Sequence, residues 1–363
     1  MKTIGLYIHI PFCTAKCPYC DFYSIKSDSN TLDKYTASLI ERINSYKSQF
    51  IADTVYIGGG TPSILGTKRL SDILKSVKYS FGTNSLETTI EVNPRSAQNL
   101  DFSLLHDCGV NRVSMGLQSS NSEELRLLGR RHNCDDVLYS VDKIRKGGID
   151  NISLDLMLGI SHQTTDSLSK SIDFCSNLDV NNISAYILKI EERTPYFLAA
   201  DSLKLPDDDS VCDLYEFTVD KLNSLGYIQY EISNFCKKGF ESKHNLKYWH
   251  CEEYLGIGPA AHSFIDKKRF YYNRSIDDFY QGIIIDDGPG GDTEEYIAMA
   301  LRLNEGLQYA KFEEYFGVPF PNNYKRKAEQ LSKTKLLLCD DNGIRLNTKG
   351  FLCSNSIISE ILY

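Results

Sequence analysis

Six short apolar runs alternate with segments of helical periodicity over the first 200 of the 363 residues. This alternation is the pattern of βα units around a parallel sheet. The runs that predict strands are 4–10, 54–57, 88–92, 112–115, 152–157 and 183–188. Helices are predicted over 31–47, near 70–77, and over 134–146 and 165–177. Six such units predict an α/β fold with an open, partial (β/α)6 barrel rather than a closed barrel of eight strands.

The remainder of the chain predicts two further parts. Residues 233–290 follow a core of residues 1–232 and show no regular alternation, and the acidic, glycine-rich run 283–291 is typical of a linker. Beyond it, helices are predicted over 293–303, 310–316, 322–333 and 349–361, with Asp340-Asp-Asn-Gly343 as a hairpin turn. Residues 291–363 therefore predict a small, winged-helix-like α+β lobe.

Three cysteines follow the first predicted strand with the spacing C-x3-C-x2-C: Cys13, Cys17 and Cys20. Four-iron clusters are normally held by one cysteine thiolate per iron, and no fourth cysteine lies nearby. One iron is then left open to a small molecule, which is a catalytic arrangement. Zinc is the alternative, because His9 or Asp21 could complete a tetrahedral site. A disulfide framework is disfavoured, since the other eight of the eleven cysteines are scattered and the amino terminus resembles no signal peptide.

Polar residues and glycines stand near the ends of four other predicted strands. Gly58-Gly-Gly-Thr-Pro62 follows the second strand, Glu91 ends the third, Gln118 lies past the fourth, and Asp155 lies within the fifth. In α/β barrels the catalytic loops converge at the carboxyl ends of the strands. We therefore expect these residues and the three cysteines to face one mouth of the barrel.

The run Tyr7-Ile-His-Ile-Pro-Phe-Cys13, with the cysteine spacing, resembles the start of radical S-adenosylmethionine (SAM) enzymes of the oxygen-independent coproporphyrinogen oxidase group, and the similarity extends over nearly all of the chain. The resemblance implies a [4Fe-4S] cluster whose open iron is chelated by SAM, with one-electron cleavage of SAM to a deoxyadenosyl radical. It implies that SAM is contacted at its amino group by Gly59, Gly60 and Thr61, and at its carboxylate by Arg130. Asp155 would accept hydrogen bonds from the ribose, and Glu91 and Gln118 would form further hydrogen bonds to SAM. Tyr7 and Tyr19 would pack against it. Taken singly, each residue could instead be a surface or barrel-filling group.

Two features resemble the heme-chaperone branch of this group. The oxidases carry a further cysteine two residues beyond the third cluster ligand, where this chain has Phe22. The run His244-Asn-Leu-Lys-Tyr-Trp249 matches the H-N-x-x-Y-W motif of the chaperones. The resemblance thus implies heme as a further ligand, with His244 as a candidate for the heme iron; His250 and His262 compete for that role, and a buried, hydrogen-bonded histidine is the common alternative. The alternative function is that of the oxidase, the oxidative decarboxylation of coproporphyrinogen III.

One segment departs from the family pattern. After the fifth strand, members usually read D-L-I-x-G-L-P-x-Q, whereas this chain reads Asp155-Leu-Met-Leu-Gly-Ile-Ser-His-Gln163, without the proline. Asp155 and Gly159 are retained, so the implied SAM contacts remain. The loop is expected to be looser than in the family.

Charge and hydropathy bound the partners. The formal net charge is −8, and residues 291–363 carry 9 Lys+Arg against 10 Asp+Glu, so a zinc-stabilised, DNA-binding regulator is disfavoured and no nucleic acid is expected. No apolar run approaches the roughly 18–20 residues that cross a bilayer. We expect a cytoplasmic protein, with peripheral docking at the inner face of the membrane left open. The resemblance implies heme, heme-accepting respiratory membrane proteins and an electron donor for the cluster as partners, and it favours the chaperone role over oxidase activity.

Overall fold

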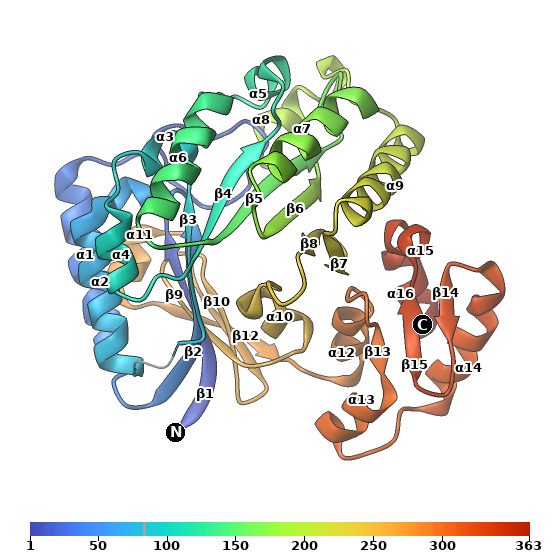
Figure 1. Cartoon of the computed structure of the whole chain (residues 1–363). Helices are drawn as coiled ribbons and strands as arrows, with labels where there is room; N and C mark the ends of the chain where they lie inside the picture. The colour runs from blue at the N-terminus through green and yellow to red at the C-terminus, as the bar shows by residue number, and fades with distance from the viewer. Residues whose placement is uncertain (83–84) are drawn as a thin grey trace.

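The computed structural model describes residues 1–82 and 85–363. Its main body is an open twelve-stranded sheet with the order β12-β11-β10-β9-β1-β2-β3-β4-β5-β6-β8-β7 (Figure 1). Six neighbouring strands run parallel in chain order: β1 (Lys2–Ile10), β2 (Phe50–Gly59), β3 (Glu87–Val92), β4 (Arg112–Gln118), β5 (Asn151–Leu158) and β6 (Asn182–Ile187). The prediction of an α/β fold with six parallel units in an open barrel is confirmed.

Helices connect these strands and cover the outer face of the sheet (Figure 1). The long ones are α1 (Ser29–Ser45), α2 (Gly66–Phe81), α6 (Cys134–Lys146), α7 (Thr165–Asn177) and α9 (Asp208–Ser224); the short ones are α3 (Pro94–Ala97), α4 (Phe102–Asp107), α5 (Ser122–Leu127) and α8 (Pro195–Leu198). Capping boxes fix the starts of two helices: Asn133 pairs with Asp136 at the start of α6, and Thr164 pairs with Ser167 at the start of α7. The helices predicted over 134–146 and 165–177 therefore have the predicted bounds.

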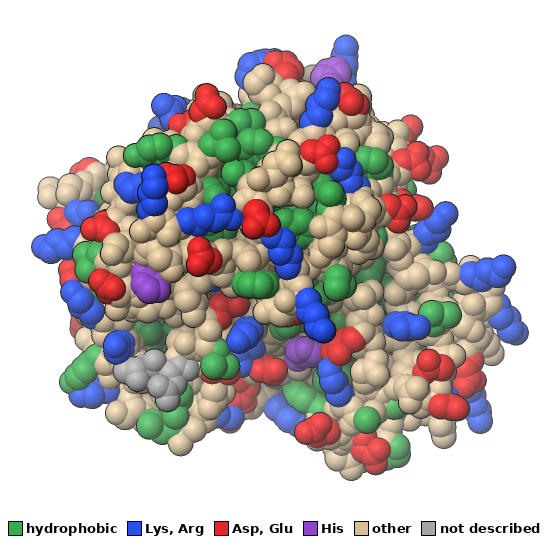
Figure 2. Space-filling model, viewed as in Figure 1, with side chains coloured by type: hydrophobic (Ala, Val, Ile, Leu, Met, Phe, Trp, Pro, Cys, Tyr) green, Lys and Arg blue, Asp and Glu red, His purple; other side chains and the backbone are tan. Residues whose placement is uncertain are grey.

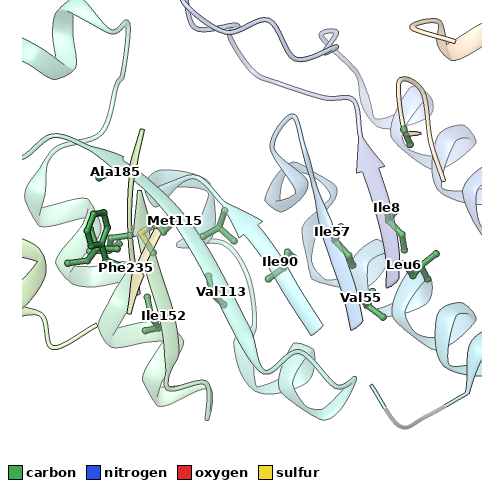
Figure 3. Packing of buried hydrophobic residues seen from close by; sticks show 14 of the residues in the cluster. Leu6, Ile8, Val55, Ile57, Ile90, Val113, Met115, Ile152, Ala185 and Phe235 are labelled. Carbon is green, nitrogen blue, oxygen red and sulfur yellow. The ribbon is translucent and has the colours of Figure 1, made fainter. Parts of the chain in front are cut away.

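The two faces of the parallel strands differ in chemistry. Ile8, Ile57 and Val113 are fully buried in one apolar core (Figure 3). The same core contains helix residues such as Leu39. Residues one position along each strand point to the opposite, inner face. One row of paired inner-face residues across β1 to β4 consists of Tyr7, Tyr56, Thr89 and Arg112. The inner face is therefore lined by polar and aromatic groups.

Further strands extend both edges of the sheet. Beside β1 lie β9 (Tyr254–Ile257), which is parallel to β1, and then the antiparallel β10 (His262–Ile265), β11 (Lys268–Tyr272) and β12 (Ile284–Pro289). Beside β6 lie β8 (Asn234–Cys236) and β7 (Ile228–Glu231). The short helix α11 (Ile276–Gln281) joins β11 to β12.

The linker predicted over 283–291 is wrong, because residues 284–289 form strand β12 at the edge of the main sheet. Its Asp, Gly and Pro residues are typical of turns. An edge strand tolerates them because its outer side forms no hydrogen bonds to a neighbouring strand. The stretch predicted as irregular thus contributes strands to the sheet. The division of the chain at 232 and 290 stays a prediction.

The carboxyl-terminal segment forms a small separate α+β lobe, as predicted (Figure 1). Its helices are α12 (Thr293–Ala300), α13 (Tyr309–Phe316), α14 (Asn322–Leu331), α15 (Thr348–Leu352) and α16 (Ser354–Leu362), and its sheet has the order β13 (Leu307–Gln308), β15 (Gly343–Leu346), β14 (Leu337–Cys339). The single last helix predicted over 349–361 is instead two helices that meet at Cys353. On the visible face, basic and acidic side chains are interspersed (Figure 2). Among the described helices, none has the length and apolar composition of a membrane span.

Candidate cofactor site

The three cysteines lie on the loop between β1 and α1, which we call the cysteine loop (residues 11–28). Backbone hydrogen bonds close its base, from Ile25 N to Pro11 O at 2.8 Å and from Cys13 N to Ile25 O at 3.1 Å. Cys13, Cys17 and Cys20 are half-buried free thiols. Within the described parts of the chain, no three His, Cys, Asp or Glu side chains already converge on a metal position. The loop therefore carries three free thiols on one short segment that follows β1.

The glycine run after β2 supports this loop directly. Gly60 N donates to Ile10 O and Thr61 N donates to Phe12 O, both at 2.8 Å. The Thr61 hydroxyl lies 3.6 Å from Cys13 Sγ. A Cβ on Gly60 would lie 2.6 Å from Phe12 O. The backbone of the glycine run therefore lies so close to the backbone of the cysteine loop that only glycine fits at this position. Thr61 thus lies beside the first of the three thiols.

Arg130 approaches the cysteine loop from the segment after α5. Its Nη1 donates to Cys17 Sγ at 3.7 Å, and its Nη2 donates to Gly116 O at 3.3 Å. Its Nε is buried and has no hydrogen-bond partner in the described residues. A planar cation with a spare donor suits both a thiolate and a carboxylate. Tyr19, on the same loop, packs edge-on against Tyr196, and burial raises the pKa of its hydroxyl.

Glu91, near the end of β3, is held from two sides. Its Oε1 accepts a hydrogen bond from the Tyr56 hydroxyl at 2.7 Å, and its Oε2 accepts one from Gly59 N at 3.1 Å. A Cβ on Gly58 would lie 2.8 Å from the Glu91 carboxyl carbon, so this glycine makes room for the carboxylate. Burial raises the pKa of Glu91 to about 7, against the opposing effect of the Tyr56 hydroxyl. The carboxylate is therefore aimed at the glycine run.

The other predicted SAM contacts lie on neighbouring strands. Asp155 on β5 accepts from the Ser114 hydroxyl at 3.3 Å, and burial raises its pKa. Gln118 ends β4 with φ +69°, at an irregularity in the pairing with β5. Tyr7 lies on the inner face of β1, where its hydroxyl hydrogen-bonds to His9 Nδ1 at 2.9 Å. The cysteine loop, the glycine run, Glu91, Gln118 and Arg130 lie at or just past the carboxyl ends of β1 to β4. Together with Asp155, which lies within β5, they form what we call the mouth.

His244 lies apart from the mouth. It belongs to helix α10 (Lys243–Trp249), which packs against β2 and α12. Its Nδ1 hydrogen-bonds to Thr54 Oγ1 at 2.9 Å, and its Nε2 to the Tyr248 hydroxyl at 2.8 Å. Thr54 precedes Gly59 by five residues, or about 17 Å along a strand. We call α10, with the Thr54 and Glu87 that contact it, the floor, and the structure does not bring His244 to the cysteines.

The three candidate heme histidines differ in access. His244 is buried, and burial lowers its pKa to about 3, so its ring is neutral. The His250 side chain is 27% exposed, and the His262 side chain is 55% exposed. The His262 ring stacks on Tyr271 with 4.7 Å between ring centroids. Of these three histidines, His244 alone has both ring nitrogens hydrogen-bonded to side chains among the described residues.

Comparisons with known proteins decide the family. Residues 7–175 match the radical SAM superfamily, and residues 292–353 match the HemN C-terminal domain. A heme chaperone HemW of Lactococcus lactis is 33% identical over 371 residues, which cover 99% of this chain and 98% of that protein. A heme chaperone HemW of Bacillus subtilis is 34% identical over 373 residues, which cover 98% of each. The chain belongs to the HemW family.

A solved structure of Escherichia coli coproporphyrinogen III oxidase (HemN), described as a radical SAM enzyme, is similar in fold to this HemW-family chain. The TM-score is 0.82 at 22% identity, and the match covers 99% of this chain and 90% of that chain. At this identity the match shows a shared fold alone. The family resemblance expected from the cysteine loop and the H-N-x-x-Y-W run is confirmed by the HemW relatives.

Several inner-face residues of the HemW-family chain lie outside the predicted set. Tyr56 contacts both Glu91 and His244, and Glu87 contacts the start of α10. Arg112 is almost fully buried, with an Nε that has no partner among the described residues. The signal that could have found them is the alternation of polar and apolar residues within these strands. Parallel strands covered on both faces read as continuous apolar runs, so polar residues at every second position indicate a functional inner face.

Proposed function

We propose that this chain is a heme chaperone on a radical SAM scaffold, which binds heme and passes it to respiratory membrane proteins. The observation that carries the proposal is the full-length similarity to the two proteins named heme chaperone HemW. The runner-up is oxygen-independent coproporphyrinogen III oxidase, whose fold is shared. Phe22, which is 66% exposed beside the third cysteine, favours the chaperone because it replaces the additional cysteine of the oxidases.

The residues at the mouth fit a [4Fe-4S] cluster and SAM by their chemistry. Three free thiols on one loop supply iron ligands, and the adjacent guanidinium of Arg130 supplies positive charge for an anionic cluster or carboxylate. When bound, such a cluster supplies an electron to SAM. We assign Cys13, Cys17 and Cys20 to iron, and Tyr7, Tyr19, Gly59, Gly60, Thr61, Glu91, Gln118, Arg130 and Asp155 to SAM.

For the heme iron, His244 offers the neutral imidazole that ligation needs. It becomes available as a ligand only when one of its ring nitrogens releases Thr54 or Tyr248. His262 presents an exposed ring without such a change. We further propose an electron donor for the cluster, action in the cytoplasm at the periphery of the membrane, and no nucleic-acid partner.

Anaerobic reconstitution tests the cluster assignment. We expect about four irons and four sulfides per chain. The cluster would have three cysteine ligands, one fewer than a fully cysteine-bound cluster. Cys17→Ser should lose them, whereas Cys353→Ser, at an exposed cysteine in the carboxyl-terminal lobe, should keep them. Stoichiometric zinc in place of iron would contradict the assignment.

Two incubations of the reconstituted protein separate the chaperone from the oxidase. With heme we expect a stable complex, and with coproporphyrinogen III, SAM and a reductant we expect no conversion. Formation of protoporphyrinogen IX would overturn the chaperone proposal. Heme spectra of His244→Ala and His262→Ala assign the ligand, since only loss of the true ligand changes the spectrum of the bound iron.

A further inference from the structure

Helix α10 is fixed at its start by a residue from a distant strand. Its N-cap, Ser242, makes no side-chain capping hydrogen bond. Instead, the Glu87 carboxylate accepts from Lys243 N at 2.9 Å and from His244 N at 3.1 Å. A carboxylate that binds free N–H groups at a helix start satisfies them and opposes the positive end of the helix. The first turn of α10, and with it His244, is thus tied to β3.

The other end of α10 is fixed by a buried cation. Lys247 Nζ lies 2.8 Å from Asp53 Oδ2 and 2.7 Å from Glu252 Oε2, and the Lys247 side chain is only 9% exposed. A cation buried this far is stable only with such partners, and removal of one partner is costly. Contacts to both β2 and β3 therefore hold α10 in one position.

One side chain continues from this helix to the mouth. The Tyr56 ring lies against the His244 ring, with 5.3 Å between centroids and 27° between planes. Its hydroxyl donates to Glu91 Oε1, and the other oxygen of Glu91 accepts from Gly59 N. The contacts His244–Tyr56–Glu91–Gly59 therefore form an unbroken path from the floor to the glycine run.

We infer that Tyr56 is a positioning residue through which α10 sets the orientation of Glu91 and thereby the affinity for SAM. The H-N-x-x-Y-W helix then acts on the SAM site at the opposite end of the inner face, in addition to any contact with heme. The inference rests on SAM binding at the mouth, as proposed above.

The charges around Glu91 predict that SAM affinity depends on pH. Burial, and then Asp155 on β5, raise the pKa of Glu91, whereas the Tyr56 hydroxyl, Gly59 N–H and Arg112 on β4 lower it. The hydroxyls of Tyr7 on β1 and Tyr248 on α10 also face this carboxylate. An ionised Glu91 is the better acceptor for the SAM amine, so affinity should fall as the pH drops through about 7. Loss of the Tyr56 hydroxyl should move that midpoint upward.

The test is the dissociation constant of SAM for the cluster-loaded protein across a pH series. Tyr56→Phe keeps the ring against His244 but removes the donor to Glu91. We expect affinity about tenfold weaker, because a hydrogen bond to a charged group is lost, and a higher pH midpoint. Tyr227→Phe is the matched control: Tyr227 is also buried, and its hydroxyl donates to Val180 O at 2.8 Å. The control should leave both the affinity and the midpoint unchanged.

A double-mutant cycle tests the part played by α10. Thr54→Val removes the hydroxyl that holds His244 Nδ1. It should weaken SAM binding several-fold in the wild-type background and have little further effect in Tyr56→Phe. Fully additive effects, or equal SAM affinity in Tyr56→Phe and Tyr227→Phe, would overturn the inference while leaving the proposed function intact. Absence of SAM binding by the wild-type protein would overturn both.

Discussion

At the mouth, Arg130 donates to Cys17 Sγ and to Gly116 O, and its Nε has no partner among the described residues. At the floor, Lys247 pairs with two carboxylates and Glu87 accepts from two backbone N–H groups. A donor without a partner at the mouth is available to a ligand, whereas the paired charges of Lys247 and Glu87 hold α10 in place. The comparison indicates a mouth built for ligands and a floor built for rigidity.

The largest expected effect breaks the floor. Glu87→Ala leaves two N–H groups of α10 without their acceptor and removes the buried carboxylate that faces Arg112. The free energy of unfolding should fall by about 3 kcal/mol or more, measured by urea titration of the metal-free chain. Glu123→Ala is the control, since that exposed carboxylate pairs with the exposed Arg126, and it should cause no measurable change. A loss below about 1 kcal/mol for Glu87→Ala would mean that the floor is not rigid.

The second prediction breaks the mouth. Gly60→Ala places a Cβ 2.6 Å from Phe12 O and forces the glycine run away from the cysteine loop. We expect the reconstituted variant to lose most of its iron while the chain still folds. Gly66→Ala is the control, because its φ of +75° costs about 1 kcal/mol of backbone strain but no atom lies near its new Cβ. Normal iron content in Gly60→Ala would contradict the support assigned to this glycine.

A third prediction uses pH to separate groups buried in their neutral forms. Burial lowers the pKa of His244 from 6.5 to about 3, so the unfolded chain binds a proton that the folded chain excludes. Its contribution to stability is present above pH 6.5 and lost as the pH falls toward 3. Burial raises the pKa of Glu231 from 4.5 to about 7, so its contribution is present below pH 4.5 and lost as the pH rises through 7.

Between these limits the two groups act in opposite directions, each with a slope of up to about 1.4 kcal/mol per pH unit. His244→Gln should flatten the rise of the unfolding free energy between pH 4.5 and 6.5, and Glu231→Gln should steepen it. Urea titrations of the metal-free chain at several pH values measure both slopes. An unchanged slope in His244→Gln would show that the imidazole is not held neutral at the floor.

The same contrast explains what the sequence could predict. The cysteines, Glu91 and Gln118 stand near strand ends, so a local pattern and one rule of barrel geometry place them at the mouth. The floor depends on contacts such as His244 to Thr54 and Glu87 to His244, which join residues 190 and 157 positions apart. No local pattern encodes such pairs. The H-N-x-x-Y-W run was visible as a motif, but the hydrogen bonds that occupy both nitrogens of His244 were not.

The smallest expected effect concerns the edge of the mouth. Phe22→Cys restores the residue type of the oxidases at a side chain that is 66% exposed, so stability should change by no more than about 0.5 kcal/mol. Iron content should stay at about four per chain, since the three ligands are untouched. We expect no conversion of coproporphyrinogen III, because one exposed thiol leaves the other residues of the mouth unchanged. Measurable protoporphyrinogen IX from this variant, and none from Phe22→Ser, would show that this position alone separates the two activities. A single side chain would then decide function at the mouth, whereas several contacts together hold α10 at the floor.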